Sequence, residues 1–375
     1  FSVSVTDANG AESTPATLTV TVAATNDTPT ISIVDGNPSF TESQGSHAAN
    51  NVTVINNAIT LADLDTAVLK NATVEITNVK AGDVLALDTS TFTKFDATLS
   101  GGVLTIAEKS GQTASTADLQ AALRAVTFAN TSDTPDTTAR TIEFKVSDGN
   151  STSTAATESV AVSAVNDTPV VDLNGATAGG NKADTFTEVD GNDDGTAAVY
   201  LNGTGTGTLT AATNLTDLDN STLASMTVST AASSIKTGDV LVLQATGGDV
   251  TLNLANNTTA NQIVSVGSQK FNVTIAADSG NQVLTIASVN DASSGTTVDA
   301  AEAATVAEFD AVLDALKFNN TVDGSPVVGD RVFAISANDG TNAGAAATVT
   351  VTVAATNDTP TVSIVDGNPS FTESQ

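Results

Sequence analysis

A long internal repeat constrains this chain more than any other feature of its sequence. Residues 19–44 read TVTVAATNDTPTISIVDGNPSFTESQ, and residues 350–375 repeat them, except that Ile31 corresponds to Val362. The two copies start 331 residues apart, since residue 350 minus residue 19 is 331. Near-identity over this length indicates recent duplication of a large unit, and self-similarity at a fixed spacing is typical of proteins built from tandem modules.

A weaker repeat divides the large one. The tetrapeptide Asn-Asp-Thr-Pro occurs at residues 26–29, 166–169 and 357–360, with spacings of 140 and 191 residues. The same phrases recur in the same order within both intervals, so the sequence predicts two homologous domains, the second with insertions around residues 176–207 and 247–269. The matching pairs are FTE at 40–42 and 186–188, LADLD at 61–65 and LTDLD at 215–219, GDVL at 82–85 and 238–241, VLTI at 103–106 and 283–286, Arg140 and Arg331, and Asp-Gly at 148–149 and 339–340.

These repeats predict a domain organisation. Residues 28–167 and 168–358 form the two domains, residues 1–27 form the C-terminal strands of a preceding repeat, and residues 359–375 form the first strand of a following one. The chain starts within a strand-like pattern, at Phe1 rather than at a Met, and shows no signal peptide. We therefore expect it to be part of a longer protein.

The hydrophobic pattern predicts an all-β fold. Apolar residues alternate with Thr and other polar residues at 17–22, 52–54, 74–76, 142–146 and 160–162, as in half-buried strands. One patch in each domain, at 117–128 and at 307–318, has helical spacing instead, with Asp118 or Glu308 near its start. Many short strands separated by turn residues predict tandem immunoglobulin-like β-sandwiches, each with one short helix, arranged as a rod.

The composition excludes several functions. With 42 acidic and 12 basic residues the net charge is −30, which argues against nucleic acid as a partner and favours cations. The chain has no Cys and one His, so thiolate and multi-histidine metal sites are excluded, and no apolar run is long enough for a membrane span. Aromatic residues are only 3% and no motif for a catalytic triad or a phosphate-binding loop occurs, so we expect no enzymatic activity.

Acidic residues recur beside each predicted domain junction. In a sandwich of this kind, the loops that hold Asp63, Asp65 and Asp148 should lie at the end of the domain where the linker Asn26-Asp27 enters. The second domain should repeat this arrangement, and the glutamate after each first strand should approach the next linker. The second set comprises Asn166, Asp167, Asp217, Asp219 and Asp339, and the two glutamates are Glu42, expected near Asn166 and Asp167, and Glu188, expected near Asn357 and Asp358.

Crowded carboxylates repel one another unless a cation lies among them. Ca²⁺ takes six to eight oxygen ligands in flexible geometry, so these sets predict calcium ions at the junctions. The alternative is a group of solvated acids beside turns, where Asp and Asn are common in any case. A further candidate calcium site is Asp190-Gly-Asn192-Asp-Asp194-Gly, which resembles the first half of a calcium-binding loop. It is not an EF-hand, because the twelfth position, where an EF-hand has Glu, is Leu201. The alternative is a flexible acidic turn.

Taken in order, these motifs resemble the cadherin-like tandem repeats of giant bacterial surface adhesins of the repeats-in-toxin type, and the related chondroitin sulfate proteoglycan repeats. The residues that carry the resemblance are FTE at 40–42, DLD at 63–65, GDVL at 82–85, GVLTI at 102–106, the helical pattern from Leu119 to Asn130, RTIEFKVSDG at 140–149 and VNDTP at 165–169. The first domain matches along its length, and the second matches outside its insertions. The resemblance implies cadherin-like sandwiches, calcium at the linkers, export, and an extracellular location on a bacterial cell surface.

The expected function is therefore mechanical. Calcium would neutralise the clustered acids and stiffen an extender region that projects a distal binding domain for cell adhesion or biofilm formation. The expected partners are calcium ions and neighbouring repeats of the same chain or head-to-tail copies, without nucleic acid or membrane insertion. The alternative is a structural surface-layer or filament protein whose modules associate with one another.

Overall fold

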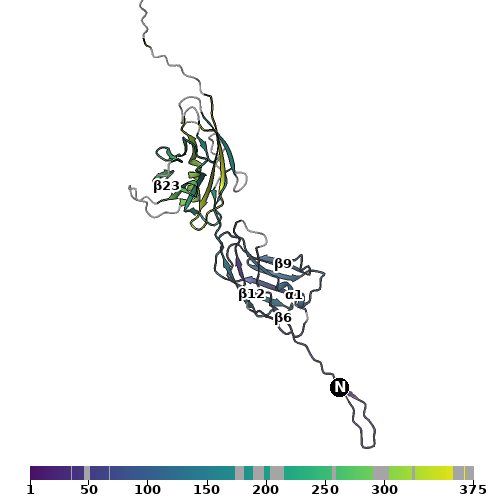
Figure 1. The fold of residues 1–375 in the computed structure, drawn as a ribbon. Helices are drawn as coiled ribbons and strands as arrows, with labels where there is room; N and C mark the ends of the chain where they lie inside the picture. Colours follow the sequence, from purple (N-terminus) through teal and green to yellow (C-terminus); the bar gives the residue numbers. More distant parts are fainter. Residues whose placement is uncertain are drawn as a thin grey trace, which may run out of the picture. The chain divides into compact units, whose positions relative to one another are not determined.

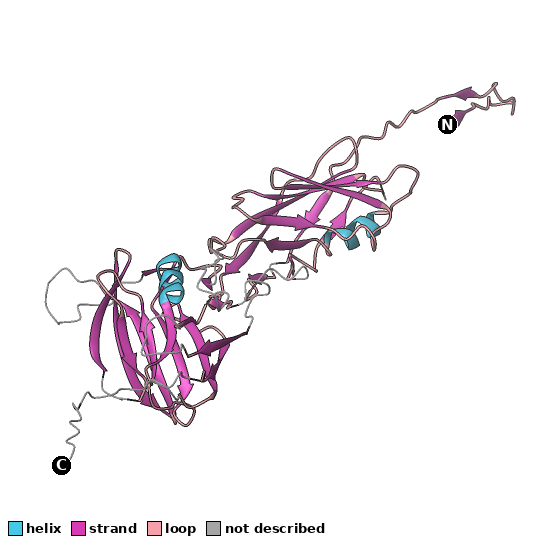
Figure 2. Cartoon of the chain, turned by 90° about the horizontal axis from the view of Figure 1, so that it is seen from above, coloured by secondary structure: helices cyan, strands magenta, loops and turns pink. Residues whose placement is uncertain are grey.

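The computed structural model describes residues 1–34, 36–45, 51–66, 68–173, 181–188, 198–202, 215–255, 259–289, 304–322, 326–357 and 367 (Figure 1). The chain divides into two compact units, Phe1–Val165 and Asn166–Gln375. Both consist almost entirely of β-strands with one short helix each, which confirms the predicted fold class (Figure 2). The boundaries of the expected repeats, at residues 27, 167 and 358, and their arrangement as a rod stay predictions.

The first unit is a β-sandwich. A six-stranded sheet has the order β4-β13-β12-β7-β10-β9, a three-stranded sheet has the order β5-β11-β8, and β3 pairs with β6. All strands pair antiparallel except β4, which runs parallel to β13. The strands are β3 (Thr30–Ser32), β4 (Ser39–Thr41), β5 (Thr53–Val54), β6 (Thr60–Ala62), β7 (Asn71–Ile76), β8 (Asp83–Ala86), β9 (Phe95–Ser100), β10 (Val103–Glu108), β11 (Thr127–Asn130), β12 (Arg140–Ser147) and β13 (Ala156–Ser163), and the helix is α1 (Thr116–Leu123).

The second unit repeats this plan with longer sheets. Its seven-stranded sheet has the order β15-β28-β27-β19-β24-β23-β22, and its four-stranded sheet has the order β16-β26-β20-β21. Two short pairs, β14 with β17 and β18 with β25, complete it. The strands are β14 (Val170–Val171), β15 (Lys182–Thr187), β16 (Val199–Tyr200), β17 (Leu215–Thr216), β18 (Thr222–Leu223), β19 (Ser225–Ala231), β20 (Asp239–Leu243), β21 (Val250–Asn253), β22 (Thr259–Val266), β23 (Gln269–Asp278), β24 (Asn281–Ser288), β25 (Ala304–Thr305), β26 (Leu316–Asn320), β27 (Gly329–Asn338) and β28 (Ala347–Ala354), and the helix is α2 (Val306–Ala315).

The insertion at residues 247–269 explains the longer sheets. It contains β21, which extends the smaller sheet beside β20, and β22, which extends the larger sheet beside β23. The insertion therefore adds one strand to each layer. Most of the other predicted insertion, at residues 176–207, lies outside the described residues.

Alternating side chains build the core of each unit. In β7 every second residue is buried, and the same alternation continues in β12. Phe40 of β4 meets Phe128 of β11 edge to face, with ring centroids 5.6 Å apart, and Phe186 meets Phe318 at the same distance in the second unit. Such aromatic pairs add about 0.5–1.5 kcal/mol beyond the apolar area that they bury. The core of each unit therefore joins its larger sheet to its smaller one.

The predicted helices are present but shorter than expected. A capping box starts each helix, from Ser115 with Asp118 in α1 and from Thr305 with Glu308 in α2. The predicted patches ran to residues 128 and 318, but α1 ends at Leu123 and α2 at Ala315. After the helices, residues 124–126 form a turn before β11, whereas β26 follows α2 directly, and Phe128 and Phe318 are buried as strand residues.

A buried ion pair holds the larger and smaller sheets together in both units. The Arg140 side chain of β12 is fully buried, and its Nε donates a hydrogen bond to Asp83 Oδ2 of β8 at 2.7 Å. Asn130 of β11 donates to the other carboxylate oxygen at 2.8 Å. In the second unit Arg331 donates to Asp239 at 2.6 Å, and Asn320 donates to Asp239 at 2.7 Å. The matching Arg and GDVL motifs of the sequence are therefore the two halves of one structural element.

The segment before the first sandwich forms a short hairpin. Strands β1 (Ser2–Val3) and β2 (Ala16–Thr17) pair antiparallel, with Ser2 opposite Thr17 and Val3 opposite Ala16. The equivalent residues of β27 and β28 pair in the same register, with Ala334 opposite Thr348 and Ile335 opposite Ala347. The strand expected over residues 17–22 is shorter than predicted: β2 ends at Thr17, Leu18 exchanges backbone hydrogen bonds with Phe1, and residues 19–22 pair with no described strand. Val3, Val5, Leu18 and Val20 are all at least 58% exposed.

We expect this hairpin to open independently of the sandwiches. An isolated pair of short strands is marginally stable at best, and its amides should exchange near the rate of unfolded chain. Hydrogen exchange on dilute monomer measures this directly. Fast exchange in residues 1–22 beside slow exchange in β12 is the expected result, whereas protection of residues 1–22 at the level of β12 would contradict it.

Candidate metal sites

Strand pairing brings the five residues of the first acidic set together. Asp63 and Asp65 follow β6, and the pairing of β6 with β3 places them beside Asn26 and Asp27, which precede β3. The Asp27 backbone amide donates to Asp65 Oδ2 at 3.1 Å, and Asn26 Nδ2 donates to Asp148 Oδ2 at 2.8 Å. We call these residues, which are Asn26, Asp27, Asp63, Asp65 and Asp148, the first acidic cluster.

Asp63 is the centre of the first acidic cluster. Its Oδ1 accepts hydrogen bonds from the backbone amides of Asp65 and Thr66, both at 3.1 Å, which fixes the carboxylate in a turn. Its Oδ2 is buried and, among the residues that the structure describes, has no hydrogen-bond partner. The contact between the two carboxylates lowers the pKa of Asp63 and raises the pKa of Asp65. Two carboxylates this close need a proton or a cation between them.

The second unit contains an equivalent set, the second acidic cluster, formed by Asn166, Asp167, Asp217, Asp219 and Asp339. Asn166 Nδ2 donates to Asp339 Oδ2 at 2.7 Å, as Asn26 does to Asp148. Asp217 Oδ1 accepts from the amides of Asp219 at 3.2 Å and Asn220 at 2.9 Å.

Asp217 repeats the orphaned oxygen of Asp63. Its Oδ2 is buried without a hydrogen-bond partner in the described part of the chain, and burial raises the pKa of Asp217 to about 6. The same unsatisfied oxygen therefore occurs at equivalent positions of two domains with different sequences. A buried carboxylate oxygen without a donor is the feature that a bound cation would satisfy.

One aspartate of each cluster, Asp148 in the first and Asp339 in the second, is held ionised. Backbone amides of Ser151 and Asn150, together with Asn26, lower the pKa of Asp148 to about 2. Burial acts to raise the pKa of Asp339, but hydrogen bonds from Asn166 and from backbone amides outweigh it and leave that pKa lowered. Each cluster thus presents a carboxylate that stays charged at neutral pH.

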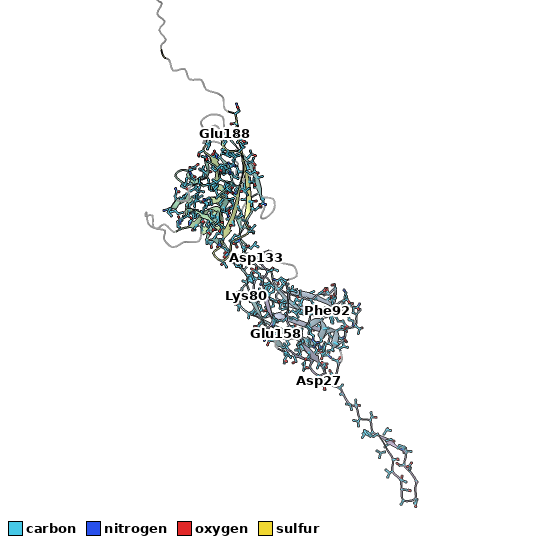
Figure 3. The ribbon with its side chains drawn as sticks, in the orientation of Figure 1. Asp27, Lys80, Phe92, Asp133, Glu158 and Glu188 are labelled. Carbon is cyan, nitrogen blue, oxygen red and sulfur yellow. The ribbon has the colours of Figure 1, made fainter. Side chains whose placement is uncertain are left out.

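Glu42 and Glu188 occupy equivalent places, directly after β4 and β15, although a short strand, β3 or β14, precedes each of these strands and they are not the first strands as expected. Glu42 is 3% exposed, and its Oε2 accepts a hydrogen bond at 2.9 Å from the backbone amide of Val165, the residue before Asn166. Glu188 is 8% exposed, and its Oε2 accepts at 3.3 Å from the amide of Thr356, the residue before Asn357 (Figure 3). Each glutamate therefore fixes the segment that leads into an Asn-Asp linker.

One acidic residue was missed by the sequence reasoning. A carboxylate oxygen of Asp133 lies within 4.8 Å of a carboxylate oxygen of Glu42. Asp133 is held by the loop after β11, where Asn130 Oδ1 accepts from the amide of Ser132 at 2.8 Å. The signal was available, because Asn-Thr-x-Asp occurs at residues 130–133 and again at 320–323. Asp323 lies outside the described residues.

Several predicted ligands lie outside the described residues. These are Asp190, Asn192, Asp194 and Asp358. The neighbouring Asn357 is described, and its side chain is exposed. For the others, the donor set suits calcium: carboxylate, amide and backbone oxygens, with neither sulfur nor imidazole. The two orphaned oxygens are the structural feature that fits a bound ion.

Comparisons with known proteins give distant structural likenesses. No family model matches the sequence, and no curated protein matches it. The surface-layer protein SbsC, domains 4–9, shares 16% identity at a TM-score of 0.21 over 92% of this chain, which spans 34% of that chain. Human CDH23 EC21-23 shares 15% identity at a TM-score of 0.25, covering 88% of this chain and 70% of that chain. The C-terminal domain of the Streptococcus pyogenes antigen I/II-family protein AspA shares 9% identity at a TM-score of 0.21, covering 87% of this chain and 98% of that chain.

The described helices do not suit a membrane span. They contain eight and ten residues, and neither is both long and apolar enough to cross a bilayer.

Proposed function

We propose that this chain is part of the extender region of a bacterial surface adhesin, in which calcium at the acidic clusters stiffens the array. The observation that carries the proposal is the recurrence of one orphaned, buried carboxylate oxygen at Asp63 and at Asp217. Beside each of them, the asparagine of an Asn-Asp linker donates the same hydrogen bond to an aspartate, Asn26 to Asp148 and Asn166 to Asp339. A repeated oxygen-only site in repeated domains has a structural rather than a catalytic chemistry.

The proposed mechanism is electrostatic. Each cluster includes the residues of an incoming linker, so an ion bound there fixes the linker to the domain that follows it. At the other end of the first unit, Glu42 and Asp133 supply two further carboxylates beside Val165, which directly precedes the linker Asn166-Asp167. We infer that they contribute to the same calcium-dependent junction.

The stiffening is tested by a distance distribution. The chain has no Cys, so the exposed pair Ser110→Cys and Ser233→Cys places one spin label in each unit. We expect millimolar calcium to narrow the distribution of label-to-label distances, and chelation to broaden it again. Magnesium at equal ionic strength is the control. A distribution that calcium leaves unchanged, with calorimetry showing no heat of binding, would contradict the proposal.

A second function has one observation in its favour. Val3, Val5, Leu18 and Val20 are exposed on the N-terminal hairpin, as they would be in a module that associates with copies of itself. Sedimentation of the full chain decides between the two. A monomer at all concentrations favours the extender, and reversible growth that a Val5→Thr/Val20→Thr variant abolishes favours the surface layer or filament.

A further inference from the structure

The last strand of each sandwich is flanked differently in the two units. In the second unit β15 lies parallel to β28 over its full length, with Lys182 opposite Val349 and Phe186 opposite Val353. In the first unit β4 lies parallel to β13 only from Ser39 onward. The FTE motifs align residue 40 with residue 186, so Gly36 takes the position of Lys182.

Glu158 takes the position of Val349. The equivalent arginines Arg140 and Arg331 lie opposite Val160 and Val351, so Val160 of β13 corresponds to Val351 of β28. Two residues earlier along these strands, Glu158 corresponds to Val349. A carboxylate therefore replaces a fully buried valine on the core side of the strand. Glu158 is itself only 3% exposed.

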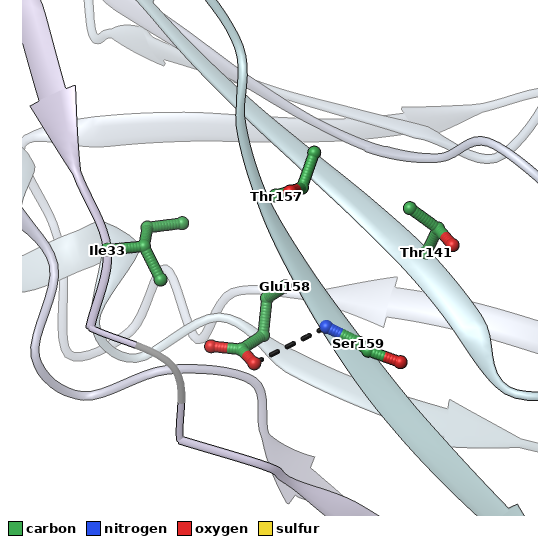
Figure 4. Close-up of a pocket in the computed structure, with 5 residues that line it drawn as sticks. All are labelled: Ile33, Thr141, Thr157, Glu158 and Ser159. Carbon is green, nitrogen blue, oxygen red and sulfur yellow. Dashed lines mark hydrogen bonds between the residues drawn. The ribbon is translucent and has the colours of Figure 1, made fainter.

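Because β4 begins only at Ser39, the part of β13 before Ala161 has no parallel partner strand among the described residues, and a pocket lies at this edge. Pro38 has no amide to donate, and the Ser159 amide bonds at 3.3 Å to the carboxylate of its own neighbour, Glu158, instead of to a partner strand. A pocket of about 260 Å³ lies here, lined by Ile33, Thr141, Thr157, Glu158 and Ser159 (Figure 4).

The Glu158 carboxylate has donors but no cation. It accepts hydrogen bonds from Asn56 Nδ2 and, at 3.3 Å, from the Gly36 amide. Within the described parts of the chain, no Lys or Arg pairs with it. An ionised carboxylate buried without a counter-charge is unfavourable, and a cation that reaches it is bound correspondingly well.

The second unit shows what fills the equivalent place. The Lys182 side chain is 9% exposed, and its ammonium donates to the Tyr200 carbonyl at 3.0 Å and pairs with Asp184 at 3.1 Å. A side chain at Gly36 would start 3.6 Å from Asn56 Nδ2 and 3.9 Å from Glu158 Oε2, which is ordinary contact distance. The first unit therefore lacks the lysine and carries a carboxylate where that side chain would pass.

We propose that the Glu158 pocket binds a lysine side chain presented by another polypeptide. The ammonium would pair with Glu158 Oε1, and the open edge at Thr157 and Ser159 would hydrogen-bond the backbone on either side of the lysine. The site is separate from the acidic clusters and does not depend on calcium.

The test uses the full chain, labelled with ¹⁵N, and the tripeptide acetyl-Ala-Lys-Ala-amide. We expect saturable shifts of the Ser159 and Gly36 amides, and about tenfold weaker binding when norleucine replaces the lysine, since one charge-assisted hydrogen bond is lost. Butylammonium should also bind about tenfold more weakly, because it cannot pair with the strand edge. Equal affinity for the norleucine peptide, or for butylammonium, would overturn the lysine-bearing polypeptide as the occupant.

Two variants locate the site. Glu158→Gln should weaken binding of the tripeptide about tenfold, whereas Glu143→Gln, which removes the same charge from the neighbouring strand, should leave it unchanged. Gly36→Lys supplies the ammonium from within the chain and should abolish binding. It keeps the proposal testable if Glu158→Gln alters the fold. Unchanged affinity in Gly36→Lys would overturn the proposal while leaving the calcium-dependent function intact.

Discussion

Replacing Asp217 with Asn is expected to abolish the calcium response of the second unit and to stabilise that unit when calcium is absent. The orphaned Oδ2 becomes an amide that donates to a neighbouring oxygen, so the repulsion with Asp219 disappears and the backbone contacts of Oδ1 remain. After discounting for solvent, we expect about 0.5–1 kcal/mol of added stability in chelator. The variant loses in exchange the stabilisation that calcium gives the native chain, about 2.7 kcal/mol when the ion is at 100 times its dissociation constant.

The pH dependence gives the same prediction a second readout. The pKa of Asp217 is raised to about 6 from 3.8, so between these values the calcium-free native state binds more protons than the unfolded state. Stability of the calcium-free chain should therefore fall as pH rises from about 4 to about 6. The advantage of Asp217→Asn should be absent at pH 4 and complete at pH 7.

Thermal unfolding in chelator and in calcium, at both pH values, measures this prediction. Asp249→Asn is the matched control, because Asp249 is exposed and belongs to neither cluster. It should respond to calcium as the native chain does. An Asp217→Asn variant that calcium still stabilises by the native amount would exclude Asp217 as a ligand.

The acidic clusters were largely predictable because they depend on strand order. Asp63 and Asp148 are 85 residues apart, since 148 minus 63 is 85, yet both follow strands that end at the same edge of a sandwich, and their meeting with Asn26 follows from that topology. The oxygens that lack a hydrogen-bond donor were not predictable from the sequence. In Asp63, both nearby backbone amides donate to Oδ1, which leaves Oδ2 without a donor, and only the turn geometry shows this.

Other features depend on packing that a pattern does not encode. The helical spacing within residues 117–128 runs only from Leu119 to Val126, and burial of Phe128 against Phe40 favours a strand after it. Glu158 stands where the alternation of β13 requires an apolar residue, and only the register with Arg140 and β4 shows that it faces inward. The role of such a residue depends on which residue of a neighbouring strand lies opposite it, and the strand register in the structure shows this, whereas the sequence pattern does not.

Loss of the buried ion pair should have the largest effect on stability. Asp239 is 1% exposed and accepts three hydrogen bonds, from Arg331, from Asn320 and from the Lys236 amide at 2.7 Å. Asp239→Ala leaves the guanidinium of Arg331, 2% exposed, without its counter-charge. We expect a loss of about 3–5 kcal/mol in the free energy of unfolding of the second unit.

Hydrogen exchange gives this measurement an internal control, because the two units contain the same element. In Asp239→Ala, protection in β27 should fall by about 3–5 kcal/mol while protection in β12 stays at its native value. Asp83→Ala should produce the reverse pattern, since Asp83 is the partner of Arg140. Adding Arg331→Met to Asp239→Ala removes the unpaired charge and should recover part of the loss. If Asp239→Ala lowers protection in β27 by less than about 1 kcal/mol, the pair is a surface-like contact of the kind that contributes little, and the sheets are held together by their apolar core alone.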